Sequence, residues 1–527
     1  MPLVVQKFGG TSVADPEKIL AAARKAIRAQ QEGNQVVMVV SAMGHNTDHL
    51  VELAQQVNER PPAREMDMLL STGEQVSVAL MAMAINRLGH KSVSLTGGQI
   101  GIKTDSTHTK ARIRSISTER MKRLLDEGNI VIAAGFQGID DDLNITTLGR
   151  GGSDTTAVAL AAVLNADSCE IYTDVDGVYT TDPRVVPEAR RVMRISYDEM
   201  LELASLGAGV MHNRAVEFGK KFGVPIHVRS SFTDTTGTMI VAEPEAADQP
   251  VCGCAMTKNE SRITVSGVAA GAGTSQRIVA RIAARNIAVD MIVQNVGEHG
   301  KADMSFTVPQ AELSVTLEAV NEAIGEFPEA TVSHEANVSK VSVVGLGMAR
   351  QTGVADQMFR TLAEAGVNIQ MITTSEIKIS VLVSRDEGVK ALRAVHGEFR
   401  LDEPPAEIGE PAGTGPTRSD AAKVVSLLQG VDMEELLVDD ISLDESQARI
   451  TVSGVPDQPG TAARVFEEVA AAGIFVDMIV QSSARDGSAN LSFTVPQQKL
   501  KEALSVVEQI QLERGRPAVS NSPRVAK

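Results

Sequence analysis

The sequence contains no tryptophan, and aromatic residues make up only 3% of its 527 residues. Large rings can therefore contribute little to the cores, which we expect to be built from Ala, Val, Ile, Leu and the 20 methionines. The rest of the composition, 43% hydrophobic and 22% charged, is that of an ordinary globular protein. The length predicts about three or four domains.

Cysteine is scarce as well. There are only three cysteines, Cys169, Cys252 and Cys254, and so small and odd a number does not indicate a disulfide framework. Cys252 and Cys254 would make half of a metal site, but no second Cys or His cluster accompanies them, so alternate positions on a strand are favoured. The nine histidines have no metal-ligand spacing, and His45 and His49 are interpreted as solvated residues. We therefore expect no metal site built from protein side chains.

Positive charge is in the minority, and long apolar runs are missing. The net charge of −17 argues against nucleic acid or an anionic membrane as the main partner. No apolar run approaches the roughly 18–20 residues of a membrane span, and Met1-Pro2-Leu3 leads into a strand without a leader pattern. No Gly-x4-Gly-Lys-Ser/Thr occurs, which excludes P-loop kinases. These absences predict a cytoplasmic enzyme.

What the first half does contain is alternation. From Met1 to about Glu245, strand-like apolar runs alternate with helical patterns, which predicts an α/β fold with a mostly parallel sheet between helix layers. In such folds ligands lie beyond the carboxyl ends of the strands. The expected strands are Val36–Val40, Ser92–Leu95, Ile130–Ala134 and Glu170–Tyr172, and the expected helices are Asp67–Leu88, Lys110–Asp126, Asp154–Leu164 and Tyr197–Phe222.

The second half is repetitive. Ile263–Gly267 recurs as Ile450–Gly454, and Asp290–Gln294 recurs as Asp477–Gln481, so the copies run in register. A more distant copy spans Val341–Val383. Each unit has the pattern of a small ferredoxin-like βαββαβ module, and such repetition indicates duplicated modules.

These patterns divide the chain into six segments. The repeat offset also places the last residues where a fourth module would begin its first strand, either because such a module was lost or because the sequence is truncated. The segments are a catalytic domain at 1–245, modules at 251–335 and 336–402, a linker rich in Pro, Gly and Glu at 403–437, a third module at 438–510 and a tail at 511–527.

The beginning of the chain has the pattern of an anion site. A short strand breaks at Gly9-Gly10 and passes into a helix, for which Asp15 is a suitable N-cap and Pro16 a suitable first residue. Two glycines let backbone N–H groups approach an anion, and Lys7 adds a cation. Taken alone, the motif also fits an ordinary turn with a solvated lysine.

Three further stretches carry candidate chemistry. Gly149–Asp154 opens a helix, where Arg150 offers a fork for a carboxylate or phosphate and Asp154 is either an N-cap or a catalytic residue. Glu74 either favours the positive end of the helix that follows it or awaits an ammonium group. Thr173–Arg184 combines Asp, Tyr and Arg side chains that suit a nucleotide base and ribose.

Together these segments resemble the aspartate kinases of the amino-acid kinase superfamily, with regulatory ACT modules on the C-terminal side. The motifs that carry the resemblance stand in the family's order at Lys7–Ser12, Ser71–Glu74, Gly149–Asp154, Thr173–Tyr179 and Ser375–Ser380. The resemblance implies the reaction ATP + L-aspartate → 4-phospho-L-aspartate + ADP, with Mg²⁺ bridging the phosphates. This is the first step of lysine, threonine and methionine biosynthesis. It also implies feedback by lysine or threonine and a homodimer or larger oligomer formed through the ACT modules.

The resemblance further implies roles for individual residues. Lys7 and Asp154 would be catalytic. Glu74 would pair with the ammonium group of aspartate and Arg150 with its α-carboxylate, with Ser41, Thr47, Gly151 and Ser153 alongside. The implied ATP-binding residues are Lys7, Phe8, Gly9, Gly10, Ser12, Thr173, Asp174, Tyr179, Asp182 and Arg184.

Effector binding is expected between paired ACT modules. The last repeat keeps the family's loop at Val455–Gly460, whereas the first repeat lacks Asp and both prolines at Val268–Gly273, so binding is more credible at the last loop. The implied effector contacts are Asp290, Gln294, Asn295, Asn368, Ile369, Asp457, Asp477 and Gln481. The alternative is that these loops only pack a dimer.

Two other functions stay open at this point. One is another kinase of the superfamily, acting on glutamate, acetylglutamate or UMP, although Glu74 and Arg150 suit the two charged ends of a free amino acid. The other is a non-catalytic amino-acid sensor, against which the intact Lys7, Arg150 and Asp154 argue.

Overall fold

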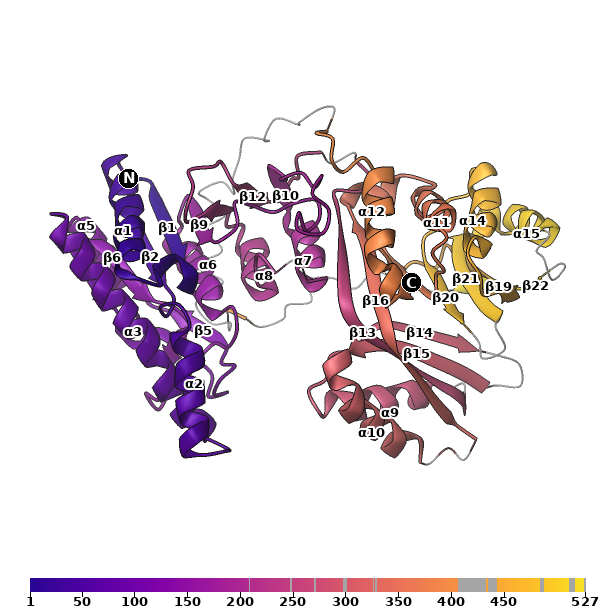
Figure 1. Ribbon diagram of the computed structural model, residues 1–527, viewed down its shortest axis with the longest axis horizontal. Coiled ribbons are helices and arrows are strands. Elements are labelled where there is room, and N and C mark those ends of the chain that lie inside the picture. Colours follow the sequence, from indigo (N-terminus) through magenta and orange to yellow (C-terminus); the bar gives the residue numbers. More distant parts are fainter. Residues whose placement is uncertain are drawn as a thin grey trace. The chain divides into compact units, whose positions relative to one another are not determined.

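The computed structural model of the chain forms two compact units (Figure 1). The structure describes residues 1–527 except 208, 247–248, 270–271, 297–300, 326, 328, 406–432, 435–442, 484–487, 511–516 and 526–527. The first unit comprises Met1–Tyr179, Arg191–Glu245 and Glu407–Asp439, and the second comprises Thr180–Arg190, Ala246–Ala406 and Asp440–Lys527. Most of the predicted linker at 403–437 therefore lies outside the described residues.

The first unit is built on an eight-stranded sheet in the order β10-β12-β11-β9-β1-β2-β6-β3. All neighbouring strands pair in parallel except β11 and β12. The four strands expected from the sequence are confirmed within this sheet. Its members are β1 (Leu3–Phe8), β2 (Gln35–Val40), β3 (Ser92–Leu95), β6 (Ile130–Ala134), β9 (Ser168–Thr173), β10 (Arg194–Ser196), β11 (Ile226–Ser230) and β12 (Thr238–Val241).

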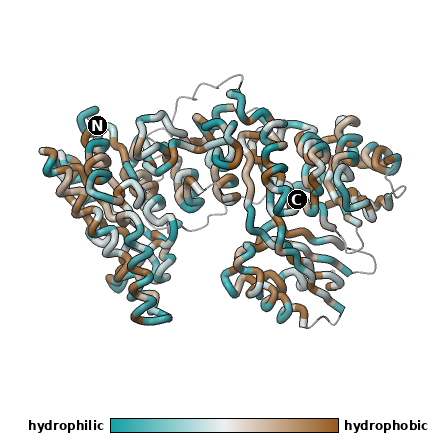
Figure 2. Tube along the Cα trace, viewed as in Figure 1, coloured by the Kyte–Doolittle hydropathy of each residue, from teal (hydrophilic) through white to brown (hydrophobic). Residues whose placement is uncertain are grey.

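Helices cover both faces of this sheet. On one face, α1 (Pro16–Gln31) and α3 (Ala63–Arg87) pack their apolar sides onto alternate residues of β1, β2 and β6 in one core. On the other, α6 (Gly152–Leu164) packs against β1, β2 and β9, and α8 (Asn213–Phe222) packs against α6. Figure 2 shows hydrophobic and hydrophilic residues alternating along the helices of this unit. The predicted α/β layering is confirmed.

Smaller elements complete the first unit. A four-stranded sheet in the order β5-β4-β7-β8 lies beside the segment that leads to α6. These elements are η1 (Gly10–Val13), α2 (Asn46–Val57), α4 (Gly97–Ile100), α5 (Glu119–Asp126), α7 (Tyr197–Ser205), β4 (Ile102–Thr104), β5 (Ile113–Ile116), β7 (Gln137–Ile139) and β8 (Ile145–Thr147).

Two helix predictions were wrong in extent. The pattern of Lys110–Asp126 forms a strand first, because Ala111 and Ile113 are buried between exposed arginines with a period of two, and α5 begins only at Glu119. The stretch Tyr197–Phe222 forms two helices, α7 and α8. The chain leaves α7 through Gly207, whose positive φ of 95° ends a helix.

One helix also corrects the expectation about apolar length. Among the described residues, α3 is long and apolar enough, by length and composition, to cross a membrane, although half of its apolar stretch is buried. Asp67 and Glu74 lie on its buried side within the first unit. We therefore interpret α3 as a core helix of the α/β fold.

The second unit is organised around a ten-stranded sheet in the order β14-β15-β13-β16-β18-β17-β20-β21-β19-β22. It carries three copies of the predicted ferredoxin-like pattern. The first copy is β13 (Gly253–Ala269), α9 (Ala272–Ala283), β14 (Asp290–Val296), β15 (Lys301–Pro309), α10 (Leu313–Ile324) and β16 (Thr331–Val344). The second copy uses the first part of β13 and the last part of β16, together with α11 (Val354–Glu364), β17 (Met371–Ser375), β18 (Lys378–Ser384) and α12 (Gly388–Glu398). The third is β19 (Gln447–Pro456), α14 (Thr461–Ala471), β20 (Ile479–Ser483), β21 (Ser488–Pro496), α15 (Leu500–Gln509) and β22 (Ala518–Val525).

The first two modules are interleaved through two long strands. The end of β13 pairs with the beginning of β16 in the first module, while residues 253–257 pair with residues 340–344 in the second. The second module is thus completed by chain that precedes the first. Its β17 pairs with β20 of the third module, and α11 packs against α14 with Phe359 and Phe466 in one core.

Candidate active site

The carboxyl ends of the central strands of the first unit open into a cavity of about 710 Å³. Lys7 at the end of β1 and the segment after β2 supply one side, and the loop between β8 and α6 supplies another. The predicted residues that line it are Lys7, Gly10, Ser41, Thr47, Glu74, Arg150, Gly151, Ser153 and Asp154. Parallel topology brings these distant segments together, as strand ends meet at one edge.

Lys7 and Asp154 form an ion pair in this cavity. The Lys7 Nζ lies 2.5 Å from the Asp154 Oδ1, and the two side chains are only 11% and 14% exposed. The N-cap of α6 is Gly151, and Asp154 lies in the first turn without a capping hydrogen bond, so the N-cap interpretation of Asp154 is wrong. A cation is therefore fixed beside the start of a helix, where an anion would be stabilised.

The Gly9-Gly10 segment brings backbone close to backbone. A Cβ on Gly10 would lie 2.8 Å from the carbonyl oxygen of Ala42, so no larger residue fits there without movement. Gly10 in turn accepts a hydrogen bond from the N–H of Gly44 at 3.0 Å. The predicted N-cap is confirmed, since Asp15 accepts from the N–H of Lys18.

Glu74 lies in the middle of α3, eleven residues after its start at Ala63, so the helix-end interpretation of this carboxylate is wrong. Its side chain is buried at 4% exposure. One oxygen, Oε1, accepts from the N–H of Ala42 at 3.2 Å, whereas no described residue donates to the buried Oε2. Burial raises the pKa of Glu74 to about 7. A buried carboxylate with an unused oxygen suits a cationic ligand group.

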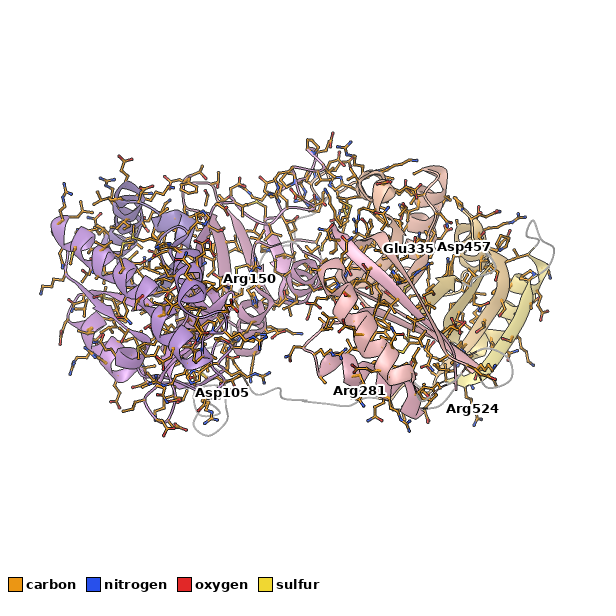
Figure 3. The ribbon with its side chains drawn as sticks, turned by 60° about the horizontal axis from the view of Figure 1, so that its bottom comes forward. Asp105, Arg150, Arg281, Glu335, Asp457 and Arg524 are labelled. Atoms are coloured by element: carbon orange, nitrogen blue, oxygen red, sulfur yellow. The ribbon has the colours of Figure 1, made fainter. Side chains whose placement is uncertain are left out.

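The loop before α6 presents Arg150 (Figure 3) and depends on two left-handed glycines. Gly149 has a φ of 76° and Gly151 a φ of 74°. A side chain on Gly151 would overlap the ring of His212, which lines the same cavity. The loop therefore has little freedom to accept any other residue.

Replacing Gly151 with alanine is expected to lower kcat/KM for aspartate, the predicted substrate, by about 10²-fold. The reason is that the overlap with His212 must displace the loop. Gly33→Ala is the matched control, since Gly33 also has a positive φ, of 94°, but nothing lies within 4 Å of its Cβ position. That control should lose roughly 1–2 kcal/mol of stability and keep its turnover. Thermal melts and initial rates of both variants check this, and equal rates for Gly151→Ala and wild type would contradict it.

A buried carboxylate that the sequence did not single out supports this loop. Asp67 accepts hydrogen bonds from the Thr147 Oγ1 at 2.5 Å and from the N–H of Thr109 at 3.0 Å, and its Oδ2 lies 2.7 Å from the His108 Nδ1. The residue is fully buried. In the sequence Asp67 is only the first residue of the predicted helix Asp67–Leu88, a position where an acidic residue is ordinary, so nothing signalled its burial.

The predicted ATP-binding residues are more scattered. Phe8 stacks on Tyr172 at a centroid distance of 4.7 Å and is buried in the core, and the Ser12 Oγ lies 2.5 Å from the Ser231 Oγ. Thr173 ends β9 and donates to Asp174. None of these four predicted residues lines the cavity around Lys7.

The remainder of the nucleotide motif divides between the units. In the first, the hydroxyl of Tyr179 donates to the Asp176 Oδ1 at 3.0 Å. In the second, Arg184 forms a bidentate pair with Asp182, and the guanidinium lowers the pKa of that carboxyl. The assignment of these residues to ATP stays a prediction.

The predicted effector residues fall into two places in the second unit. Between modules two and three, the Asn368 Nδ2 donates to the Asp457 Oδ1 at 3.0 Å, and the Gln481 Nε2 donates to the carbonyl of Ile369. Asp457 is labelled in Figure 3. In the first module, Asp290 pairs with Lys340 and Gln294 accepts from Ser275, with Asn295 on the same strand, β14.

The pair formed by modules two and three has a cavity on each side. The one beside the Val455–Gly460 loop is nearly filled, at about 10 Å³. The other, about 340 Å³, lies at the start of α11 beside Asp356 and the segment Ile474–Asp477. The two sides are therefore unequal in the space that they offer a ligand.

Comparisons with known proteins agree with this architecture. Residues 2–230 match the amino acid kinase family, and residues 341–399 and 450–511 match an ACT domain. Aspartokinase of Pseudomonas aeruginosa is 49% identical over 407 residues, covering 77% of this chain and 99% of its own. Aspartokinase 2 of Bacillus subtilis is 49% identical over 409 residues, covering 77% and 100%.

A solved structure supports the fold. Aspartokinase III of Escherichia coli, solved in complex with aspartate and ADP, superposes with a TM-score of 0.64 at 24% identity, covering 75% of this chain and 99% of that one. Near-half identity to whole aspartokinases, together with the kinase and ACT matches, shows the family. This chain belongs to the aspartate kinases, the ATP-dependent amino-acid kinases that carry ACT domains.

Proposed function

We propose that this chain transfers the γ-phosphoryl group of ATP to the side-chain carboxylate of L-aspartate. The observation that carries the proposal is one cavity holding the Lys7–Asp154 pair, Arg150 and the unpaired buried oxygen of Glu74. The Escherichia coli protein, solved with aspartate and ADP, supports the proposal, because these are the acceptor and the nucleotide product of the reaction. By its family, the reaction opens the biosynthesis of lysine, threonine and methionine.

The chemistry requires little more than placement and charge. A carboxylate nucleophile is ionised at neutral pH, so no general base is needed, and catalysis reduces to orienting the reactants and neutralising the transferring phosphoryl group. Lys7 supplies the cation, and Gly10 lines the same cavity, whereas the N–H of Gly9 donates to the carbonyl of Tyr172 at 3.3 Å. Asp154 orients Lys7 through their ion pair.

Aspartate would be held by its two charged ends. Glu74 takes the ammonium group, because its Oε2 is buried and has no described donor. Arg150 takes the α-carboxylate through its guanidinium fork. Ser41 and Thr47 line the amino-acid side of the cavity, and Ser153 lies at the start of α6.

Mg²⁺ belongs to this proposal as a companion of ATP. The ion prefers oxygen ligands and is commonly bound through one or two carboxylates together with substrate phosphates. Asp154 is a carboxylate in the cavity that fits this role, since its side chain is within reach of solvent at 14% exposure. The metal would neutralise charge on the phosphates.

A panel of acceptors tests the substrate. ADP release is measured with aspartate, glutamate, acetylglutamate, UMP or no acceptor. The proposal requires turnover with aspartate far above the others. Preference for another acceptor would indicate a different kinase of the superfamily, and no release with any acceptor would indicate a sensor.

We also propose that a feedback amino acid binds the larger cavity between modules two and three. A second structure of the Escherichia coli relative was solved with lysine and aspartate. In this chain Asp356 lies at that cavity with a buried Oδ1 to which no described residue donates a hydrogen bond, and burial raises its pKa. The loop at Asp457 is less suitable, because Asn368 already occupies its carboxylate.

Asp356→Asn is expected to raise the concentration of lysine or threonine needed for half-inhibition about tenfold, since an amide pairs poorly with an effector ammonium group. Asp457→Asn should change it less than about twofold. Inhibition curves with lysine, threonine and both decide between the cavities. The reverse ranking of the two variants would assign the effector to the Val455–Gly460 loop.

Assembly and location complete the proposal. We expect a homodimer or larger oligomer formed through the ACT modules, because the ten-stranded sheet ends in two edge strands, β14 and β22, that can pair with another copy. We expect the enzyme in the cytoplasm. Light scattering of the purified chain measures the first expectation and cell fractionation the second.

A further inference from the structure

Two described residues between the second and third ACT modules dock onto the first unit. Met433 and Glu434 form a turn within the first unit, although the modules on either side of them belong to the second. The Glu434 carboxylate accepts two hydrogen bonds from Arg214, whose Nε and Nη2 each lie 2.6 Å from one of its oxygens. The N–H of Ile113 donates to the same carboxylate at 2.8 Å.

Met433 anchors the turn beside this ion pair. Its side chain is 2% exposed, its N–H donates to the carbonyl of Arg114 at 3.2 Å, and its carbonyl accepts from the Lys221 Nζ at 3.0 Å. The Glu434 side chain is 9% exposed. The turn is therefore held by backbone, apolar and charged contacts at once.

Arg214 connects this turn to the substrate loop. Its Nη1 donates to the carbonyl of Leu148 at 2.6 Å, and its Nη2 also donates to the carbonyl of Ala111 at 2.7 Å. Leu148 immediately precedes the Gly149–Gly152 stretch that lines the cavity, and Arg214 follows His212 and Asn213, which line it too. One guanidinium thus joins the acidic turn to the backbone of the loop that carries Arg150.

A buried guanidinium keeps a fixed orientation only while its donors are satisfied. Removing the Glu434 carboxylate takes away both oxygens that accept hydrogen bonds from Arg214. The charge of Arg214 is then left partly buried, at 19% exposure, without its acidic partner. The side chain would then turn toward water, and the carbonyl of Leu148 would lose its donor. A loop whose shape depends on two left-handed glycines is sensitive to such a loss.

We propose that Glu434 is a positioning residue for aspartate binding: by clamping Arg214, the Met433–Glu434 turn holds the Gly149–Gly152 loop in its binding shape. The inference rests on the proposed function of that loop. It assigns to the Met433–Glu434 turn a role in the affinity for the amino-acid substrate, separate from effector binding between the modules.

Glu434→Ala tests the clamp in the full-length enzyme. KM for aspartate should rise about tenfold, while kcat and KM for ATP stay within about twofold, because a displaced loop weakens ground-state contacts to aspartate. Glu434→Gln keeps an acceptor of the same shape and should give an intermediate KM. Glu445→Ala, at an exposed acidic residue beyond the turn, is the matched control and should behave as wild type.

Hydrogen exchange of the same variants supplies a readout independent of turnover. The Ile113 amide, which donates to Glu434, and the amides of residues 149–152 should exchange faster in Glu434→Ala and not in Glu445→Ala. An unchanged KM, a lowered KM, or unchanged exchange at Ile113 would each overturn the inference. If wild type releases no ADP with aspartate, the proposed function fails instead, while the exchange data still report whether the clamp exists.

Discussion

Lys7→Ala is expected to lower kcat by about 10³-fold while KM for aspartate changes less than about threefold. The expectation follows from position, since the Lys7 Nζ lies at the end of β1 in the cavity, paired with Asp154 rather than with the residues proposed to hold aspartate. A cation that acts on the transferring phosphoryl group contributes mainly in the transition state, and its loss therefore appears in kcat. Initial rates of ADP release at saturating ATP and aspartate measure the effect.

Lys18→Ala is the control for the loss of a lysine. Lys18 lies on α1, where its partly exposed ammonium group pairs with Asp15 outside the cavity, so its rates should match wild type. Equal rates for Lys7→Ala and wild type in a hydroxamate assay would refute the role of Lys7. A large rise in KM for aspartate without loss of kcat would move Lys7 to the substrate side.

Glu74→Gln is expected to raise KM for aspartate about 10²-fold, because a buried carboxylate that faces an ammonium group is replaced by a neutral amide. The wild-type enzyme should also show a pH dependence. Burial raises the pKa of Glu74 to about 7 in the free protein, and the substrate ammonium requires the ionised form. KM for aspartate should therefore fall about tenfold between pH 6 and pH 8.

Two measurements check the direction of this pH dependence: KM for aspartate in Glu74→Gln, and the stability of the wild-type protein as a function of pH. In Glu74→Gln the pH dependence of KM near pH 7 should disappear. The folded protein binds the Glu74 proton more tightly than the unfolded chain does, because the pKa is raised from 4.5 to about 7. The contribution of this residue to the free energy of unfolding is therefore fully present below pH 4.5 and is lost as pH rises through about 7. A KM that rises with pH over the same range would contradict the ammonium assignment.

The sequence was sufficient for the parts of the site that are local patterns. Gly9-Gly10 after a strand, the Asp15 cap and the glycine-rich segment before α6 each follow from the short-range preferences of their residues. Parallel strand order then places their ends at one edge, which is how Lys7 and Arg150 come to line one cavity. The roles of the individual residues, by contrast, come from the family resemblance and do not follow from this geometry.

The supports of the site could not be predicted, because they depend on burial and on contacts between distant segments. Asp67 looked like any acidic residue near a helix start, yet it is fully buried and holds Thr109 and Thr147. Glu434 lies in a segment expected to be only a linker, and its partner Arg214 is 220 residues away in the chain. No periodicity connects such pairs.

Two features of the second unit also depend on contacts between distant segments. The predicted modules at 251–335 and 336–402 are interleaved, because the first part of the 17-residue β13 pairs with the last part of β16 in the second ACT module. The loop at Val455–Gly460 has the family's pattern, while Asn368 contacts Asp457 on that side and more space lies on the opposite side. The assignment of the loop to an effector stays a prediction. Local motifs do not report which of two related cavities is closed by neighbouring side chains.

Isotope transfer tests the central claim most directly. Aspartate labelled with ¹⁸O in its side-chain carboxylate is incubated with ATP and the enzyme, and the acyl phosphate is trapped with hydroxylamine, which attacks the carbonyl carbon and releases phosphate with the bridging oxygen. If the carboxylate attacks the phosphorus of ATP beside Lys7, the released phosphate carries one ¹⁸O and a hydroxamate forms in equal amount, and Lys7→Ala loses both. Phosphate without ¹⁸O, or ADP release that does not depend on aspartate, would contradict the account.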